Sequence, residues 1–209
     1  AVTAQAGNSI VFNWNVPSSN GGVAITGYNP QVSTDGGTTW TNLWTTPTNA
    51  LTFTHTGLVT GQNYSYQVNA INAVGNSPYT ATLSVIAGDV PAQVTGLSTT
   101  AVSDTEIDLT WNIPANNAYP VSSYNILRST DGTTWTTLTS NTNSYSDTGL
   151  TADTNYTYKV SAVNILGTGA ESTTTQQRTF GLPDPVTTIT FTPQSTTQIN
   201  LSWTQPNLN

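Results

Sequence analysis

The residues of this chain most able to do chemistry are three carboxylates that lie close together in the sequence, Asp104, Glu106 and Asp108. A glycosidase needs two carboxylic acids that face each other across a sugar, one of them with a raised pKa. Here Ile107 and Leu109 alternate with the acids, so Glu106 and Asp108 are predicted to share the outward face of one strand. Neighbours on an outward face do not enclose a substrate, and we interpret all three as a solvated surface.

The sequence also lacks the residues that other kinds of catalysis and metal binding use. The chain has one histidine, His55, and no cysteine, whereas a zinc site needs several strong ligands and a Ser-His-Asp triad needs all three members together. The sequence also lacks the acidic spacing of an EF-hand calcium loop. We therefore predict no catalytic residue, no cofactor and no metal ion, and we do not expect this segment to be an enzyme.

Charge and hydropathy narrow the range of partners. Lys and Arg number three, the formal net charge is −7, and charged residues make up 6% of the chain. Binding to nucleic acid or to an anionic membrane needs clustered basic residues, and no apolar run is long enough to span a bilayer. We expect no nucleic-acid partner and no membrane insertion. A surface rich in Ser, Thr, Asn and Gly favours an extracellular or cell-surface location.

The elements that carry these residues come as a repeat. The pattern Ile-x-x-x-Trp-x-x-Pro occurs three times, with its tryptophan at Trp14, Trp111 and Trp203. Spacings of 97 and 92 residues allow each repeat to hold its own core, and Gly and Pro mark the joints between repeats. We predict domains at 1–88, with a first strand that is short or missing, at 89–181, and at 182–209, where only the first two strands of a third domain are present.

Within each repeat, apolar and polar residues alternate with a period of two, which is typical of half-buried strands. Short alternating runs between clusters of Gly, Pro, Asn and Asp predict an all-β fold of tandem seven-stranded immunoglobulin-like β-sandwiches arranged end to end. The first repeat is expected to have strands near 9–15, 24–33, 39–45, 51–56, 62–71 and 77–86. The second is expected to have them near 93–99, 105–112, 121–129, 134–139, 143–147, 154–164 and 170–179.

Two motifs make each complete repeat resemble a fibronectin type III domain: the Trp followed by Pro, and a Leu-x5-Tyr corner that leads into Val-x-Ala-x-Asn-x-x-Gly. The first repeat carries them as Trp14, Leu58, Tyr64 and 68–75, and the second as Trp111, Leu150, Tyr156 and 160–167. The resemblance implies that Trp14, Trp111 and Trp203 fill sandwich interiors, and that Tyr64 and Tyr156 form tyrosine corners.

A hairpin motif also recurs, as Ser33–Trp40 and, one residue shorter, as Ser129–Trp135. The first copy resembles the Asp-box hairpin of sialidases, in which Asp holds the turn, Gly takes positive φ and Trp clasps the strands. That box is distant from catalysis, so the resemblance implies a structural hairpin. Trp44 has no tryptophan counterpart in the second repeat, and we predict that it is the exposed ring that contacts a sugar or a protein partner.

Three Asn-x-Ser/Thr sequons, at Asn63, Asn155 and Asn200, predict N-glycosylation acceptors in a host that glycosylates secreted proteins. The features together favour a non-catalytic structural or adhesive segment of an extracellular stalk, fibre or filament. The alternatives are a carbohydrate-associated accessory module of an extracellular hydrolase, or a decoration or fibre domain of a phage or virus. Expected partners are a protein, through self-association or a surface receptor, or a glycan.

Overall fold

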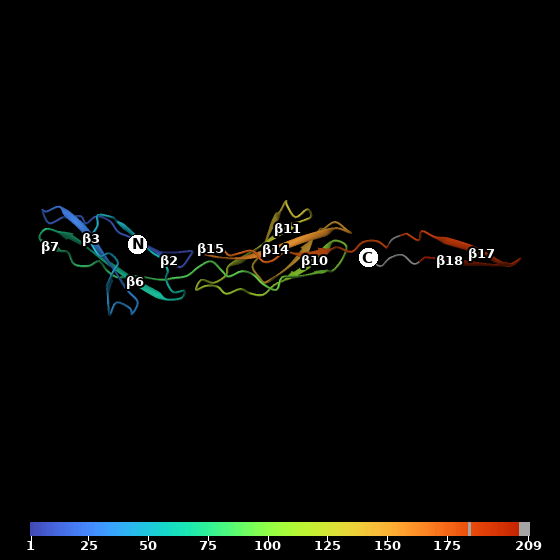
Figure 1. Cartoon of the computed structure of the whole chain (residues 1–209), viewed down its shortest axis with the longest axis horizontal. Helices are drawn as coiled ribbons and strands as arrows, with labels where there is room; N and C mark the ends of the chain where they lie inside the picture. The colour runs from blue at the N-terminus through green and yellow to red at the C-terminus, as the bar shows by residue number, and fades with distance from the viewer. Residues whose placement is uncertain (184, 205–209) are drawn as a thin grey trace. The chain divides into compact units, whose positions relative to one another are not determined.

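The computed structural model describes residues 1–183 and 185–204, so Gln205 and Pro206, the end of the third tryptophan motif, lie outside the described residues. Over the described ranges the chain forms strands and turns and no helix (Figure 1). The predicted all-β class is therefore confirmed. These ranges contain no helix that could cross a membrane. The strands form sandwich 1 (residues 2–86), sandwich 2 (residues 98–178) and a C-terminal hairpin (residues 189–203).

Sandwich 1 consists of a three-stranded sheet and a larger sheet. Its strands are β1 Val2–Gln5, β2 Ser9–Asn13, β3 Ile25–Ser33, β4 Thr41–Asn42, β5 Thr52–His55, β6 Asn63–Asn72, β7 Gly75–Asn76 and β8 Leu83–Ile86. The small sheet has the order β1-β2-β5, and the large one has the order β4-β3-β6-β7, with β8 also paired to β6. Pro78 lies between β7 and β8 and has no N–H to give to a ladder, which interrupts the last strand of the sandwich. With β7 and β8 taken as one interrupted strand, the sandwich has the expected seven.

Sandwich 2 repeats this arrangement. Its strands are β9 Ser98–Ala101, β10 Glu106–Thr110, β11 Ser123–Ser129, β12 Thr136–Ser140, β13 Ser144–Thr148, β14 Asn155–Asn164, β15 Gly167–Thr168 and β16 Thr175–Arg178. The small sheet has the order β13-β10-β9, and the large one has the order β12-β11-β14-β15, with β16 also paired to β14. The same sequence pattern has therefore produced the same topology twice.

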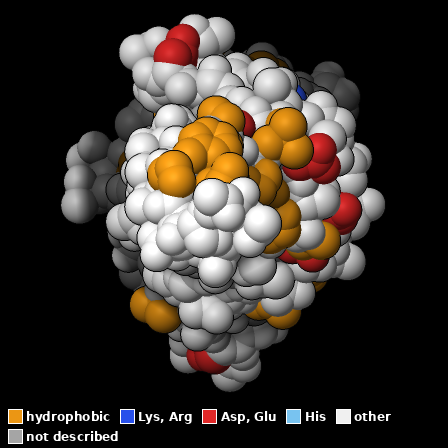
Figure 2. All heavy atoms as spheres, turned by 90° about the vertical axis from the view of Figure 1, so that its right-hand side faces the viewer, with side chains coloured by type: hydrophobic (Ala, Val, Ile, Leu, Met, Phe, Trp, Pro, Cys, Tyr) orange, Lys and Arg blue, Asp and Glu red, His pale blue; other side chains and the backbone are white. Residues whose placement is uncertain are grey.

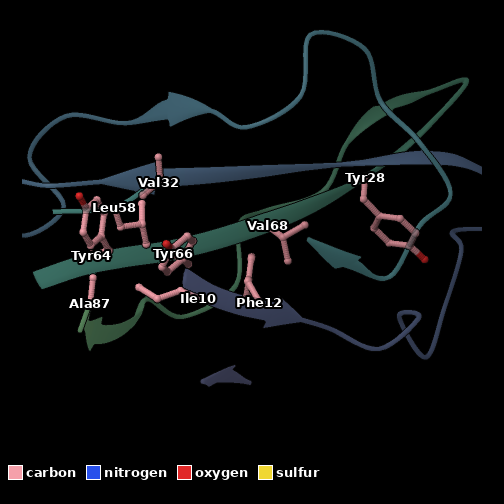
Figure 3. Packing of buried hydrophobic residues seen from close by; sticks show 9 residues of the cluster. All are labelled: Ile10, Phe12, Tyr28, Val32, Leu58, Tyr64, Tyr66, Val68 and Ala87. Carbon is pink, nitrogen blue, oxygen red and sulfur yellow. The ribbon is translucent and has the colours of Figure 1, made fainter. Parts of the chain in front are cut away.

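The inward-pointing residues of the alternating runs form the two cores. In sandwich 1, Phe12 of β2 lies 5.4 Å from Tyr66 of β6, measured between ring centroids (Figure 3). Each fully buried side chain of this size contributes about 1.5–3 kcal/mol to folding. The buried cluster of sandwich 1 consists of Ile10, Phe12, Tyr28, Val32, Leu58, Tyr64, Tyr66, Val68 and Ala87. In sandwich 2 the buried residues include Ile107, Leu109, Trp111, Tyr124, Ile126, Tyr156, Tyr158, Val160 and Ala162.

Some strand bounds differ from the expectation. The opening strand of sandwich 1 was predicted to be short or missing, and it is the short, four-residue β1, paired with β2; two other runs differ from the expectation. The run 93–99 enters a ladder only from Ser98, because Gly96, with a φ of 66°, turns the backbone out of the extended conformation. The run 39–45 contributes only Thr41–Asn42 to the sheet.

The C-terminal hairpin pairs β17 Ile189–Ser195 with β18 Gln198–Trp203. Its register places Ile189 opposite Trp203 and Phe191 opposite Leu201, so these side chains share one face. Figure 2 shows hydrophobic side chains gathered on the face turned toward the viewer. Trp203, predicted to fill a core, is 63% exposed, because the described residues include no second sheet against this face.

Candidate functional site

The three carboxylates raised by the sequence do not form a catalytic pair. Ile107 and Leu109 are buried, and Glu106 and Asp108 lie between and beside them on the opposite face of β10. Asp108 accepts a hydrogen bond from the Ser146 hydroxyl at 2.5 Å, and Asp104 is exposed. Among the described residues no group of three His, Cys, Asp or Glu side chains is placed to hold a metal ion.

Both predicted corner tyrosines have the geometry of a tyrosine corner. The Tyr64 hydroxyl accepts a hydrogen bond from the backbone N–H of Val59 at 3.1 Å, and the Tyr156 hydroxyl accepts one from Thr151 at 2.9 Å. Each bond runs back over five residues from the start of a long strand. Leu58 and Leu150 are buried below. Both hydroxyls are thus bonded to the backbone of their own corner, which is the contact of a structural residue.

Within the two sandwiches the tryptophans divide into a buried and a half-buried set. Trp111 is 3% exposed. Trp14 is half-buried and packs against the core of sandwich 1. Trp44 was predicted to be an exposed ring, but it is also half-buried, with its centroid 5.7 Å from that of Trp14 and 6.0 Å from that of Phe53. Its contacts are those of a core-edge residue, which weakens its case as a sugar platform.

The two hairpin motifs are closed turns built around an aspartate. Asp35 accepts hydrogen bonds from the Thr39 hydroxyl at 2.6 Å and from the backbone N–H groups of Thr38 and Thr39. The Trp40 indole N–H donates to the Gly37 carbonyl at 2.9 Å. In the second copy, Asp131 accepts from the backbone N–H groups of Thr133 and Thr134 at 2.8 and 2.7 Å. The carboxylates hold their own loops and are not directed at a ligand.

These hydrogen bonds predict a displaced titration of Asp35 and Asp131. The pKa of Asp35 is held well below its usual range, chiefly by the Thr39 hydroxyl, and that of Asp131 chiefly by the Thr134 N–H. Because each folded pKa is lower than the unfolded one, ionised Asp35 and Asp131 stabilise the folded chain. This contribution is fully present above the unfolded pKa of about 3.9 and is lost as the pH falls below that value toward the folded pKa. Carboxyl ¹³C titration by NMR should give lower midpoints in the folded chain than in urea. Equal midpoints in the two states would contradict the prediction, and Asp35→Asn and Asp131→Asn assign the signals.

A buried polar contact missed by the sequence analysis lies in each core. In sandwich 2, Asp147 is 2% exposed. It accepts a hydrogen bond from Arg128 Nη1 at 2.7 Å and another from the Tyr158 hydroxyl at 2.8 Å. In sandwich 1, His55 Nδ1 lies 3.0 Å from the Tyr66 hydroxyl. Burial is the main cause that raises the pKa of both tyrosines, so these hydroxyls stay protonated and serve as structural groups.

His55 is expected to make sandwich 1 less stable in mild acid. Burial among Phe53, Tyr64 and Tyr66 lowers the pKa of its imidazole. Between the unfolded pKa of about 6.5 and the lower folded value, the unfolded chain binds a proton that the folded chain does not, so stability falls as the pH drops through this window. The urea midpoint should be lower at pH 5 than at pH 7.5. His55→Gln should reduce that difference, and equal losses in both proteins would rule the mechanism out.

A cleft of about 410 Å³ lies at the surface of sandwich 1. Its walls come from the segments 17–21 and 70–77, which Asn72 joins by donating from Nδ2 to the Asn20 carbonyl at 3.0 Å. The Asn72 Oδ1 accepts the backbone N–H groups of Val74 and Gly75. The Asn72 amide therefore ties the two loops together through bonds on both its nitrogen and its oxygen.

The three predicted glycan acceptors lie on the surface. Asn63 and Asn155 are exposed at the first positions of β6 and β14, and Asn200 is exposed in β18. All three side chains are accessible to solvent, and their modification stays a prediction.

Two antiparallel sheets packed over an aromatic core, each sandwich with a tyrosine corner, define the class as immunoglobulin-like β-sandwiches. The family model for the fibronectin type III domain matches residues 1–86 and 92–178. The chain therefore belongs to the fibronectin type III family and carries two of its domains in tandem.

Two enzymes and one crystal structure are similar to this chain. The chain is 33% identical over 175 residues to exoglucanase B of Cellulomonas fimi, and this alignment covers 79% of this chain and 15% of the enzyme. It is 33% identical over 173 residues to chitinase A1 of Niallia circulans, covering 79% and 23%. The chain thus spans less than a quarter of either enzyme. A crystal structure of titin domains matches with a TM-score of 0.61 at 20% identity over 87% of this chain and 62% of that one, which concerns the fold alone.

Proposed function

We propose that this segment is a non-catalytic structural or adhesive module of an extracellular multidomain protein. The observation that supports the proposal is the use of its aromatic and acidic residues. Its buried aromatic rings pack in cores and corners, and Asp35, Asp131 and Asp147 accept hydrogen bonds from their own loops or cores. The described residues hold no enclosed pair of acids. In the two similar enzymes, the part that matches this chain makes up less than a quarter of the protein.

Localisation tests this proposal directly. Antibodies against the chain should label intact cells of the source organism, or the protein should be found in the culture medium. Label that appears only after the cells are made permeable would contradict an extracellular role. The purified chain should also release no soluble sugar from cellulose or chitin, and measurable hydrolysis would contradict the non-catalytic assignment.

The C-terminal hairpin supports a further part of the proposal, a third fibronectin type III domain that begins in the range 182–209. Its tryptophan lies in the same motif as Trp111, but its apolar face is uncovered in the described residues. Exposed apolar strands favour pairing with added strands. Light scattering on the folded 209-residue chain tests self-association through this face. A strictly monomeric chain would contradict self-association and would leave the domain assignment standing.

A second candidate, an accessory module of an extracellular polysaccharide hydrolase, is favoured by the two similar enzymes. Reading the coding sequence on both sides of this segment tests it. A neighbouring hydrolase domain would support the accessory role, and an anchor or a long series of further repeats would favour a stalk or fibre.

A further inference from the structure

The outer face of the large sheet in sandwich 1 carries a hydrogen-bonded row of four amide side chains, which we call the amide row: Asn29, Gln31, Asn42 and Gln67. Gln31 is its centre. Its Nε2 donates to Asn42 Oδ1 at 2.8 Å, and its Oε1 accepts from Gln67 Nε2 at 2.8 Å. Asn29 Nδ2 donates to the same Asn42 oxygen at 3.2 Å. The row therefore crosses three adjacent strands, β4, β3 and β6.

The strand register directs the amide row to solvent. Gln31 is the cross-strand partner of Gln67 and of Asn42. Its chain neighbours Pro30 and Val32 are buried on the opposite face, so the row points away from the core. With neighbouring strands about 4.8 Å apart, the three strands present a platform about 10 Å wide. Tyr79 borders the row, with its hydroxyl 3.5 Å from Asn29 Nδ2 and its side chain 39% exposed.

The fold itself does not require this row. Counted from the shared Ser, Trp and Tyr positions, Gln31, Asn42 and Gln67 correspond in sandwich 2 to Leu127, Thr137 and Lys159. The fourth position, Asn29, is kept as Asn125, and sandwich 2 forms the same sheet order without the other three amides. The amide row is thus a property of one domain, which is expected of a recognition surface and not of a folding determinant.

The row also has unused hydrogen-bonding capacity. A primary amide offers two donors and two acceptor lone pairs, and the bonds within the row use only some of them. Next to Asn29 on the same face of the sheet lies its cross-strand partner Asn69, which is 4% exposed and has an Oδ1 without a donor among the described residues. A ligand rich in hydroxyl groups matches mixed donors and acceptors of this kind, because each hydroxyl both donates and accepts.

Charge identifies which hydroxyl-rich ligand fits. Between residues 1 and 88 the only Asp, Glu, Lys or Arg is Asp35, and its carboxylate is bonded within its own turn. The face therefore offers no cation to an acidic sugar or a phosphate. It also lacks the cluster of buried aromatic and aliphatic anchors that protein interfaces use. We propose that the amide row and the Tyr79 ring bind a neutral polysaccharide. The inference goes beyond the structural role proposed above and does not depend on it.

A triple variant that copies sandwich 2 tests this inference. Gln31→Leu, Asn42→Thr and Gln67→Lys together replace the row by residue types that the same fold already accepts. Affinity gels and calorimetry with cellohexaose and chitohexaose should show binding by the native chain. The triple variant should bind about tenfold to a hundredfold more weakly, the loss of one or two hydrogen bonds. Tyr79→Ala should also weaken binding. Gln5→Leu, which changes an exposed amide of β1 on the other sheet, is the matched control and should bind normally.

Three results would overturn the inference. They are a folded native chain that binds neither oligosaccharide, a triple variant that binds as well as the native chain, and tighter binding to polygalacturonate than to the neutral probes. Thermal unfolding of each variant confirms that it is folded. None of these results affects the localisation test, so failure of the glycan site and failure of the structural role are distinguishable.

Discussion

Trp111→Ala should lower the free energy of unfolding of sandwich 2 by about 3–5 kcal/mol. The indole is 3% exposed, and it follows Ile107 and Leu109 along the inward face of the same run. Removing it deletes a large apolar contact and leaves a cavity that the two sheets cannot close. Small domains have only about 5–15 kcal/mol of stability in total, so the variant should be close to unfolded at 37 °C.

Urea denaturation followed by hydrogen exchange, read peptide by peptide, measures this effect and assigns it to residues 92–178. The matched control is Trp203→Ala, the same change at the equivalent motif position, where the ring is 63% exposed. Trp203→Ala should lower the free energy of unfolding by much less than Trp111→Ala. If the two variants lost similar stability, Trp111 would not have the core role assigned to it.

Asp147→Ala should have the second large effect, about 3–5 kcal/mol. Asp147 is 2% exposed, while the Arg128 side chain is 25% exposed. Removing the carboxylate leaves the guanidinium and the Tyr158 hydroxyl without their acceptor in a region with little water, and such unpaired groups are strongly destabilising. Breaking the buried pair therefore costs more than the pair itself contributes.

Sandwich 1 provides the compensating change. The positions of Arg128, Asp147 and Tyr158 correspond there to Val32, His55 and Tyr66, and both sandwiches fold. The double variant Arg128→Val, Asp147→His should therefore lose less stability than Asp147→Ala alone, a non-additive result measured by a double-mutant cycle.

The exposed pair Arg178–Asp153, at 2.6 Å and about half exposed on both sides, is the control. Exposed pairs contribute about 0–1 kcal/mol, so Arg178→Ala should change stability very little. An Asp147→Ala variant as stable as Arg178→Ala would contradict the account of a buried charge.

Much of the fold could be predicted because it depends on local pattern. Alternation with a period of two placed Ile107 and Leu109 inward, and the Leu-x5-Tyr spacing located both corner tyrosines. In each case the relevant partners lie within one strand or a few residues along the chain. The hairpin turns were predictable for the same reason, since Asp35 and Asp131 bond to residues two to four positions away.

The wrong prediction for Trp44, and the contacts that were not predicted, concern residues on different strands or segments. Trp44 was expected to be exposed, but Trp14 and Phe53, from two other segments, cover part of its ring. Asp147 was not singled out, because its partner Arg128 lies 19 residues away on another strand. The amide row was also missed, because Gln31 and Gln67 are 36 residues apart and become neighbours only through the register of β3 and β6.

The sequence alone established an all-β chain of repeated fibronectin type III domains, the aromatic residues of its cores and the turns of its hairpins. These features follow from side-chain alternation and backbone preference, which act over a few residues. Only the tertiary structure decided which polar groups meet. Pairing of the sheets brought a buried aspartate to an arginine in one domain and joined four amides into a surface in the other. Such contacts depend on the register between strands that are far apart in the sequence, and that register is not encoded within a single strand.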